Sequence, residues 1–241
     1  MASLIGAIRS SMSDGWWIIK LAAASGLLYY AVEKAPAYIP NSSGKLVFYA
    51  VIGLLFLGCG VSAMSRNLNN SSPIFPGLMN IPEVLFKSAG AFAAVLTGIV
   101  ILYFLIYYAS LFPMENIVKY IIYALIILFT VPFIIIPLVL FSARSNLFDA
   151  FRLGIIFKSA GNFIINFIVY LLQSAFIYVL SFVCLYFFLG QMFGAGHISQ
   201  HILIYIMAPI VFFTSMIYFS DLYDDVIVAI EEPKPKKKKI R

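Results

Sequence analysis

The chain has 241 residues, of which 63% are hydrophobic and only 11% are charged, and its formal net charge is +6. A soluble domain of this size could not cover so much apolar surface with so few charged side chains, and the mean hydropathy is +1.00. The composition excludes an ordinary water-soluble protein and predicts a chain whose solvent is largely lipid.

Six apolar stretches are long enough to cross a bilayer, which takes about 20 residues of helix. The stretches are continuously apolar rather than alternating, and helices satisfy all their backbone groups internally, so the pattern predicts a helical bundle. The first stretch is the weakest, because it is short and carries Lys20 near its start. The predicted spans are Trp16–Val32, Leu46–Met64, Ser88–Phe112, Val118–Phe141, Phe163–Gly190 and Ile202–Phe219.

The spans fall into three similar units, at about 1–70, 71–148 and 149–230. In each unit a short amphipathic segment precedes an outgoing span, and a short turn leads to a returning span. The segments are predicted to lie in the cytoplasmic headgroup layer. The predicted fold is therefore all-α and polytopic, with six transmembrane helices in three hairpins that form one domain. The side chains predicted to anchor the junctions at the interface are Trp16, Trp17, Lys20, Lys87 and Lys158.

The sequence FKSAG occurs twice, at Phe86–Gly90 and at Phe157–Gly161. In both copies the lysine stands at the start of an outgoing span, and Ser-Ala-Gly enters the bilayer. Small residues allow a neighbouring helix to approach closely. The two copies are interpreted as equivalent joints of a repeated architecture.

Lysine and arginine gather on the side of the two termini, and only Lys34, Lys45 and Lys119 fall at the opposite ends of spans. The positive-inside rule then predicts that both termini are cytoplasmic. The expected location is the inner (plasma) membrane of a prokaryote, and the endoplasmic reticulum membrane is the alternative for a eukaryotic source.

Residues 231–241 form a polybasic tail, EEPKPKKKKIR, which is predicted to be disordered. Each cation near an anionic leaflet contributes on the order of 1 kcal/mol of attraction. Anionic membrane lipids are therefore expected partners of the tail. The residues that would supply this attraction are Lys234, Lys236, Lys237, Lys238, Lys239 and Arg241.

The fifth span is the most polar, because Asn162, Asn166, Tyr170 and Gln173 fall close to one helix face. One interpretation is a polar path or a headgroup contact. The other is interhelical hydrogen bonding, worth about 0.6 to 2 kcal/mol per contact in membranes. No Asp, Glu, Lys or Arg lies deep within any predicted span, where a buried charge would mark a functional site.

Three segments carry a family resemblance: AIRSSMSDGWWIIKLAAASGLL at Ala7–Leu28, GCGVSAMSRNLNNSSPIFPGLMN at Gly58–Asn80, and NLFDAFRLGIIFKSAGNF at Asn146–Phe163. In these the chain resembles an uncharacterised family of mainly prokaryotic polytopic membrane proteins, catalogued only as a domain of unknown function (family four-zero-one-three). It departs from the family at Phe75–Leu78, where the family tends to show Leu-Pro followed by Trp and an acidic residue. The resemblance implies an integral membrane protein without an assigned activity, and it transfers no catalytic residue.

The residues therefore predict a non-enzymatic membrane protein without catalytic, cofactor-binding or metal-ligating residues. The leading hypothesis is an interaction or assembly component, or a lipid-organising subunit, with other membrane subunits or a homo-oligomer as partners. The alternative is a small transporter or channel that uses the polar face of the fifth span, aided by bends at Pro132 and Pro137. No nucleotide-binding loop is present, and no nucleic acid is expected as a partner.

Overall fold

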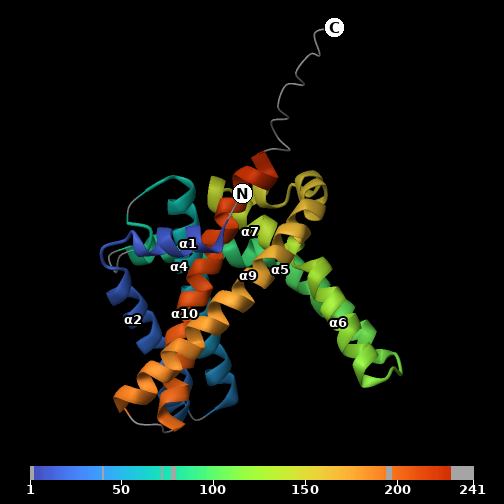
Figure 1. The fold of residues 1–241 in the computed structure, drawn as a ribbon. Coiled ribbons are helices and arrows are strands. Elements are labelled where there is room, and N and C mark those ends of the chain that lie inside the picture. Colours follow the sequence, from blue (N-terminus) through green and yellow to red (C-terminus); the bar gives the residue numbers. More distant parts are fainter. Residues whose placement is uncertain (1–2, 40, 72, 77–79, 194–196, 229–241) are drawn as a thin grey trace.

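The computed structural model describes residues 3–39, 41–71, 73–76, 80–193 and 197–228, and every regular element within these ranges is a helix (Figure 1). The prediction of an all-α chain is confirmed for these residues. The labels η1 and η3 denote π-helical turns. The elements are α1 (Leu4–Met12), α2 (Trp17–Tyr29), η1 (Tyr30–Lys34), α3 (Ala35–Tyr38), α4 (Ser42–Leu68), α5 (Ile81–Leu111), α6 (Asn116–Thr130), α7 (Pro132–Arg144), α8 (Leu147–Ala150), α9 (Leu153–Phe193), α10 (His197–Leu222) and η3 (Tyr223–Val228).

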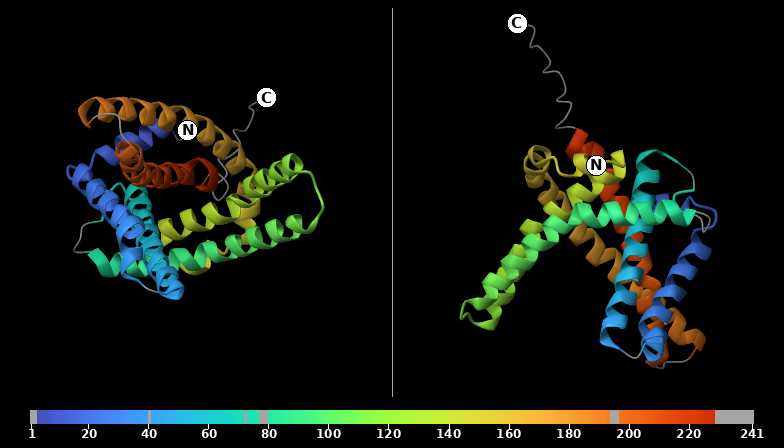
Figure 2. Two further views of the ribbon diagram at one scale, coloured as in Figure 1. Left: turned by 90° about the horizontal axis from the view of Figure 1, so that it is seen from below. Right: turned by 180° about the vertical axis from the view of Figure 1, so that it is seen from behind.

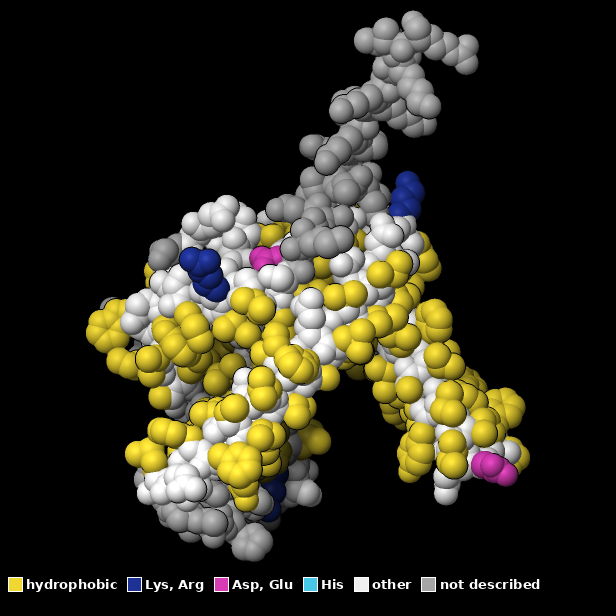
Figure 3. Space-filling view, in the orientation of Figure 1, with side chains coloured by type: hydrophobic (Ala, Val, Ile, Leu, Met, Phe, Trp, Pro, Cys, Tyr) yellow, Lys and Arg dark blue, Asp and Glu magenta, His cyan; other side chains and the backbone are white. Residues whose placement is uncertain are grey.

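Five of these helical segments are long and apolar enough to cross a membrane: α4, α5, the consecutive pair α6–α7, α9 and α10. They coincide with the last five predicted spans. The pair α6–α7 is interrupted at Val131, directly before Pro132, whose ring lacks a backbone donor and disrupts a continuing helix. Hydrophobic side chains cover the flanks of the helices, and charged side chains stand near their ends (Figure 3).

The first predicted span differs from the others. Helix α2 has 13 residues, and it continues through η1 and α3 to Tyr38. Between Lys20 and Glu33 the charge-free stretch is about 18 Å long at 1.5 Å per residue, whereas the hydrocarbon layer is about 30 Å thick. The segment also meets α1 at an angle of 100°. A sixth span therefore stays a prediction, and it requires the bent pair to count as one crossing.

The segments before the three outgoing helices take different forms. In the first unit α1 is a separate helix, and the hydroxyl of Ser3 accepts the N–H of Gly6 to cap it. In the second unit α5 runs without a break from Ile81, and in the third α9 runs without a break from Leu153. In the third unit the predicted segment is divided, because the short helix α8 precedes α9 and the chain leaves the helix at Phe151 and Arg152. An amphipathic segment in the headgroup layer before each span stays a prediction.

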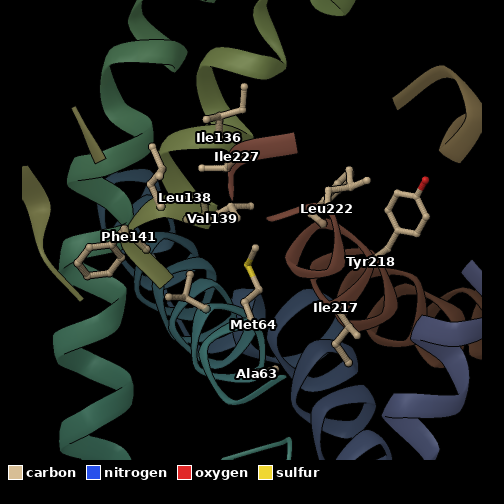
Figure 4. Close-up of a cluster of buried hydrophobic side chains, with 14 of the residues drawn as sticks. Ala63, Met64, Ile136, Leu138, Val139, Phe141, Ile217, Tyr218, Leu222 and Ile227 are labelled. Atoms are coloured by element: carbon tan, nitrogen blue, oxygen red, sulfur yellow. The ribbon is translucent and has the colours of Figure 1, made fainter. Parts of the chain in front are cut away.

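The three returning helices, α4, α7 and α10, contact one another and form the centre of the bundle. At one end of the bundle they share a core of fully buried side chains. Figure 4 shows Met64 of α4 among Val139 of α7 and Ile217 of α10. The core thus lies where the returning helices converge, on the same side as α1 and η3 (Figures 1 and 2).

The outgoing helices pack in a cyclic pattern. Each contacts the returning helix of the preceding unit: α5 contacts α4, α9 contacts α7, and α2 contacts α10. Helices α5 and α9 also pack against the returning helix of their own unit. Among the described helices, α2 is the exception, because it does not pack along α4. Helices α2 and α4 are therefore not packed along each other in the way that the other neighbouring helices are.

The later half of α5 and the whole of α6 extend away from the centre as a two-helix arm (Figures 1 and 2). Large side chains on this arm are exposed, among them Tyr103, Tyr107 and Tyr120. An exposed apolar arm of this length fits a lipid environment, in which such surface carries no penalty.

The two FKSAG copies have different surroundings. A Cβ added at Gly90 would overlap the ring of Phe141, whereas a Cβ added at Gly161 would meet no atom within 4 Å. The serines are alike, since Ser88 and Ser159 are both buried. Only the first copy serves as a joint at which another helix approaches closely.

This difference predicts unequal effects of the same substitution. Gly90→Ala is expected to lower the free energy of unfolding by about 1–2 kcal/mol, because the Phe141 ring must shift within a packed core. Gly161→Ala is expected to be neutral or to stabilise by up to about 1 kcal/mol through higher helix propensity. Thermal unfolding of the two purified variants measures this, and equal midpoints would contradict the assignment.

Candidate functional site

Helix α2 is the least tightly held of the long elements. None of its residues is buried, and its first turns carry the small residues Ala22, Ala23 and Ala24. Small side chains on a helix that does not reach its neighbour leave space that no other side chain fills. Of these three residues, Ala23 and Ala24 border a hollow.

A groove of about 510 Å³ lies between α2, α4 and α10. Its α2 wall runs from Trp16 to Leu27, and its far wall includes Phe56 of α4 and Phe213 of α10. Lys20 supplies the only charged side chain of the lining. The groove is therefore an apolar slot along a helix surface, with a single cation near one end.

That cation is held by a buried carboxylate at the bend between α1 and α2. Asp14 is 1% exposed, and its Oδ2 accepts a hydrogen bond from Lys20 Nζ at 2.8 Å. Its Oδ1 accepts the N–H of Trp16 at 3.0 Å, and its Oδ2 also accepts the N–H of Phe75 at 3.2 Å. Lys20 in turn donates to the carbonyl of Phe75 at 2.9 Å. We call Asp14, Lys20 and the backbone of Phe75 the inner anchor.

The protonation of Asp14 follows from these contacts. Burial by itself raises the pKa of the carboxyl, since it disfavours the charged form. The hydrogen bonds from Lys20 and Trp16, the charge of Lys20 and the N–H of Phe75 outweigh burial and leave the pKa below its ordinary value. The carboxylate is therefore ionised at neutral pH, and the inner anchor is a charged pair.

The inner anchor joins segments that are distant in the sequence. Asp14 and Phe75 are separated by the whole of α2, η1, α3 and α4, and their contact fixes the α4–α5 connection to the α1–α2 bend. The predictions included Lys20 but gave Asp14 no role of its own. The signal in the sequence that could have indicated this pair is the Asp-x5-Lys spacing across the start of the first span.

The two other lysines predicted as interfacial anchors differ in whether they form an ion pair. Lys87 pairs with Glu83 at 2.8 Å, and Glu83 also pairs with Arg66 at 3.3 Å. Lys158 is exposed, and within the described ranges no carboxylate pairs with it. The two tryptophans also differ, one being exposed and the other packed.

Trp16 is 66% exposed at the end of the groove, whereas Trp17 packs against the core. A place for the exposed indole at the headgroup level, where tryptophan is favoured, stays a prediction. The residues predicted for surface electrostatics, at 234–241, lie outside the described residues.

The polar residues predicted on the fifth span lie on α9 and turn toward different partners. Gln173 accepts the N–H of Leu4 at the start of α1 at 3.2 Å, and Tyr170 bonds to Ser215 of α10. Asn166 donates to the carbonyl of Asn162, one turn earlier in the same helix. These bonds give Tyr170 and Gln173 the role of helix contacts.

Further polar contacts join the same end of the bundle. Asn67 of α4 donates to Ser220 at 2.9 Å and to Asp221 at 2.7 Å, both in α10. Asp149 pairs with Arg144 at 3.4 Å and with Arg152 at 3.3 Å at the corner between α7 and α9. No group of three His, Cys, Asp or Glu that could hold a metal occurs among the described residues.

Comparison of the chain with protein-family models, with curated proteins and with solved structures finds no match. The resemblance to the family of unknown function therefore stays a prediction. Any statement about function has to come from the geometry of the helices themselves.

Proposed function

We propose that this protein is a non-enzymatic integral membrane protein that binds and orders a phospholipid, with an acyl chain in the groove between α2 and α4. The observation that carries the proposal is the apolar slot of about 510 Å³ along a helix surface that would face lipid. An empty slot in a bilayer forfeits dispersion contacts on every wall. A hydrocarbon chain from the surrounding membrane restores these contacts.

The inner end of the groove supports a headgroup position. A lysine ammonium has three donors, and Lys20 uses two of them on Asp14 and Phe75. The third donor and the exposed indole N–H of Trp16 are suited to phosphate and ester oxygens. Because Asp14 balances the charge of Lys20, this end would select a phosphate by hydrogen bonding more than by net charge.

The length of α2 supports a role in ordering lipid. A charge-free stretch of about 18 Å in a hydrocarbon layer of about 30 Å causes local thinning of the bilayer or snorkelling of the flanking charges. Helix α9 is mismatched in the opposite sense, since its 41 residues extend for about 60 Å. Lipids next to α2 and α9 would differ from bulk lipid in tilt and thickness.

The wider setting remains as the sequence predicts it. We place the protein in a prokaryotic plasma membrane with both termini cytoplasmic, and the basic tail at 231–241 on anionic headgroups. The inner anchor then lies at the cytoplasmic headgroup layer. A role as a subunit of a larger membrane assembly is compatible with lipid ordering, because the arm of α5 and α6 leaves a large apolar surface.

Filling the groove is expected to release the lipid. Ala23 lines the groove and Ala22 does not, so Ala23→Phe should occupy the slot while Ala22→Phe adds a ring on the lipid-facing side. After extensive detergent washing, native mass spectrometry should find one more phospholipid retained on the wild type and on Ala22→Phe than on Ala23→Phe. Retention by Ala23→Phe should fall about tenfold, which corresponds to about 1.4 kcal/mol.

The comparison between Ala23→Phe and Ala22→Phe decides the proposal. Equal retention by all three proteins would mean that the lipid is bound elsewhere, and no retention by the wild type would remove the groove as a binding site. Melting temperatures of both variants equal to that of the wild type would show that the fold is unchanged.

A further inference from the structure

A second hollow flanks α2 at the end opposite to the inner anchor. It has a volume of about 510 Å³ and lies between α2, η1 and the beginning of α10. Ser25 and Gly26 form its floor on α2, and Ile202 and Ile206 form its wall on α10. Unlike the groove, it is bordered by a carboxylate, that of Glu33, and by two phenol rings.

Glu33 occupies an unusual backbone position. It lies in the π-helical turn η1, which follows α2 directly, and π-helical turns occur frequently at functional sites. Its Oε1 accepts a hydrogen bond from the hydroxyl of Tyr205, and the side chain remains exposed. No lysine, arginine or histidine pairs with Glu33 in the part of the chain that the structure describes. One carboxylate oxygen is thus left for a ligand.

Two tyrosine rings lie beside this carboxylate. Tyr29 and Tyr205 meet edge to face with their centroids 5.4 Å apart, and both border the hollow. Ring faces attract ammonium groups, and a set of rings with one carboxylate is the usual chemistry for recognising an alkylammonium ion.

We infer that this second hollow binds the ammonium group of a zwitterionic phospholipid headgroup. Glu33 neutralises the ammonium charge, and Tyr29 and Tyr205 contact its methyl or methylene groups. An ammonium ion in the hollow would give the exposed carboxylate of Glu33 a charged partner beside the two tyrosine rings. The inference does not depend on the groove, which lies at the other end of α2.

The surroundings favour a phospholipid over a free amine. Lys34 follows Glu33 directly and is exposed, and although it lies outside the lining of the hollow it supplies a cation next to Glu33 in the chain. The isoleucines and the exposed rings of Tyr29 and Tyr30 offer apolar surface for the glycerol and upper chain. A headgroup that carries both charges therefore matches Glu33 and Lys34 together, whereas a simple amine matches Glu33 alone.

Competition between lipids of different headgroups tests the inference. The full chain would be exchanged into mixed micelles containing equal amounts of phosphatidylcholine and phosphatidylglycerol, and retained lipid would be identified by native mass spectrometry. The wild type should retain phosphatidylcholine in preference at this site. Glu33→Gln keeps an acceptor for Tyr205 but loses the charge, and it should reduce the preference at least about fivefold.

Controls separate the site from general effects of charge and folding. Glu115→Gln removes another exposed carboxylate, in the turn before α6, and should leave the preference unchanged. Tyr29→Leu removes a ring without touching the charge and should also weaken the preference. An unchanged preference in both Glu33→Gln and Tyr29→Leu, or an equal loss in Glu115→Gln, would overturn the inference.

Two further arms identify the source of the ammonium group and separate this site from the groove. Millimolar choline should not displace retained phosphatidylcholine, and displacement at that concentration would overturn the assignment to a lipid headgroup. Ala23→Phe should lose the lipid of the groove and keep the headgroup preference. If Ala23→Phe lost both the lipid of the groove and the headgroup preference, a single lipid would account for the two results. That outcome would overturn the second site.

Discussion

Replacing Asp14 by alanine is expected to lower the free energy of unfolding by about 2–3 kcal/mol and the melting temperature by about 5–10 °C. The variant leaves the ammonium of Lys20 and the N–H groups of Trp16 and Phe75 without their buried acceptor. Removing one partner of a buried ion pair is destabilising because the other charge stays behind. The α1–α2 bend should then detach from the α4–α5 connection.

The measurement is thermal unfolding followed by tryptophan fluorescence. Trp16 and Trp17 are the only tryptophans of the chain, and they follow Asp14 by two and three positions, so their emission reports on the inner anchor. Asp14→Asn keeps the acceptor for the backbone donors and loses the charge, so its effect should be about half as large. An alanine variant that melts like the wild type would show that the anchor contributes no stability.

The pH dependence of the same contact has a defined sign. Because the folded-state pKa of Asp14 lies below the ordinary value of 3.8, its contribution to stability is fully present above pH 3.8. It is lost as the pH falls through the folded-state pKa. The stability difference between wild type and Asp14→Ala should therefore be constant between pH 5 and pH 8 and should shrink in stronger acid.

Replacing Gly58 by alanine is expected to destabilise the bundle by about 2–3 kcal/mol. A Cβ at this position of α4 would overlap the backbone carbonyl of Val84 and crowd the side chain of Ser88, both in α5. A backbone atom cannot rotate aside as a side chain can, so α4 and α5 would have to separate. These two helices are in extensive contact, so a separation at Gly58 would disturb packing along both of them.

Gly53 of the same helix provides the matched control. A Cβ there would meet no atom within 4 Å, so Gly53→Ala should be neutral or should stabilise by up to about 1 kcal/mol. Unfolding of the two variants in one detergent compares them directly. If Gly58→Ala unfolds at the same midpoint as Gly53→Ala, the close approach of α4 and α5 at Gly58 is refuted.

The relation between sequence and structure is clearest at α9. The stretch Phe163–Gly190 predicts a long helix, and the helix is present, but the four polar residues on it have separate roles. Gln173 forms a hydrogen bond with the start of α1, and Tyr170 forms one with α10. Asn166 forms its hydrogen bond with Asn162 in the same helix. A helical wheel places these residues on one face, and only the tertiary structure shows which neighbour each one meets.

The FKSAG repeat illustrates the same limit. Identical pentapeptides predict identical joints, yet Gly90 lies against the ring of Phe141 and Gly161 lies in open space. The difference arises because α7 crosses α5 at the first copy, whereas no helix approaches Gly161 at the second. A local sequence cannot specify which distant helix will approach it.

By itself the sequence determined the helical class and five of the six apolar helices that it predicts, because backbone groups in lipid must bond within their own helix and long apolar runs leave no other solution. Only the tertiary structure decided the cyclic packing, the gap beside α2 and the partners of Asp14 and Glu33. The physical reason is that lipid and protein core are equally apolar, so hydropathy does not mark the face of a helix that packs inward. That face is chosen by shape, small residues and a few buried polar contacts, which exist only once the helices have assembled.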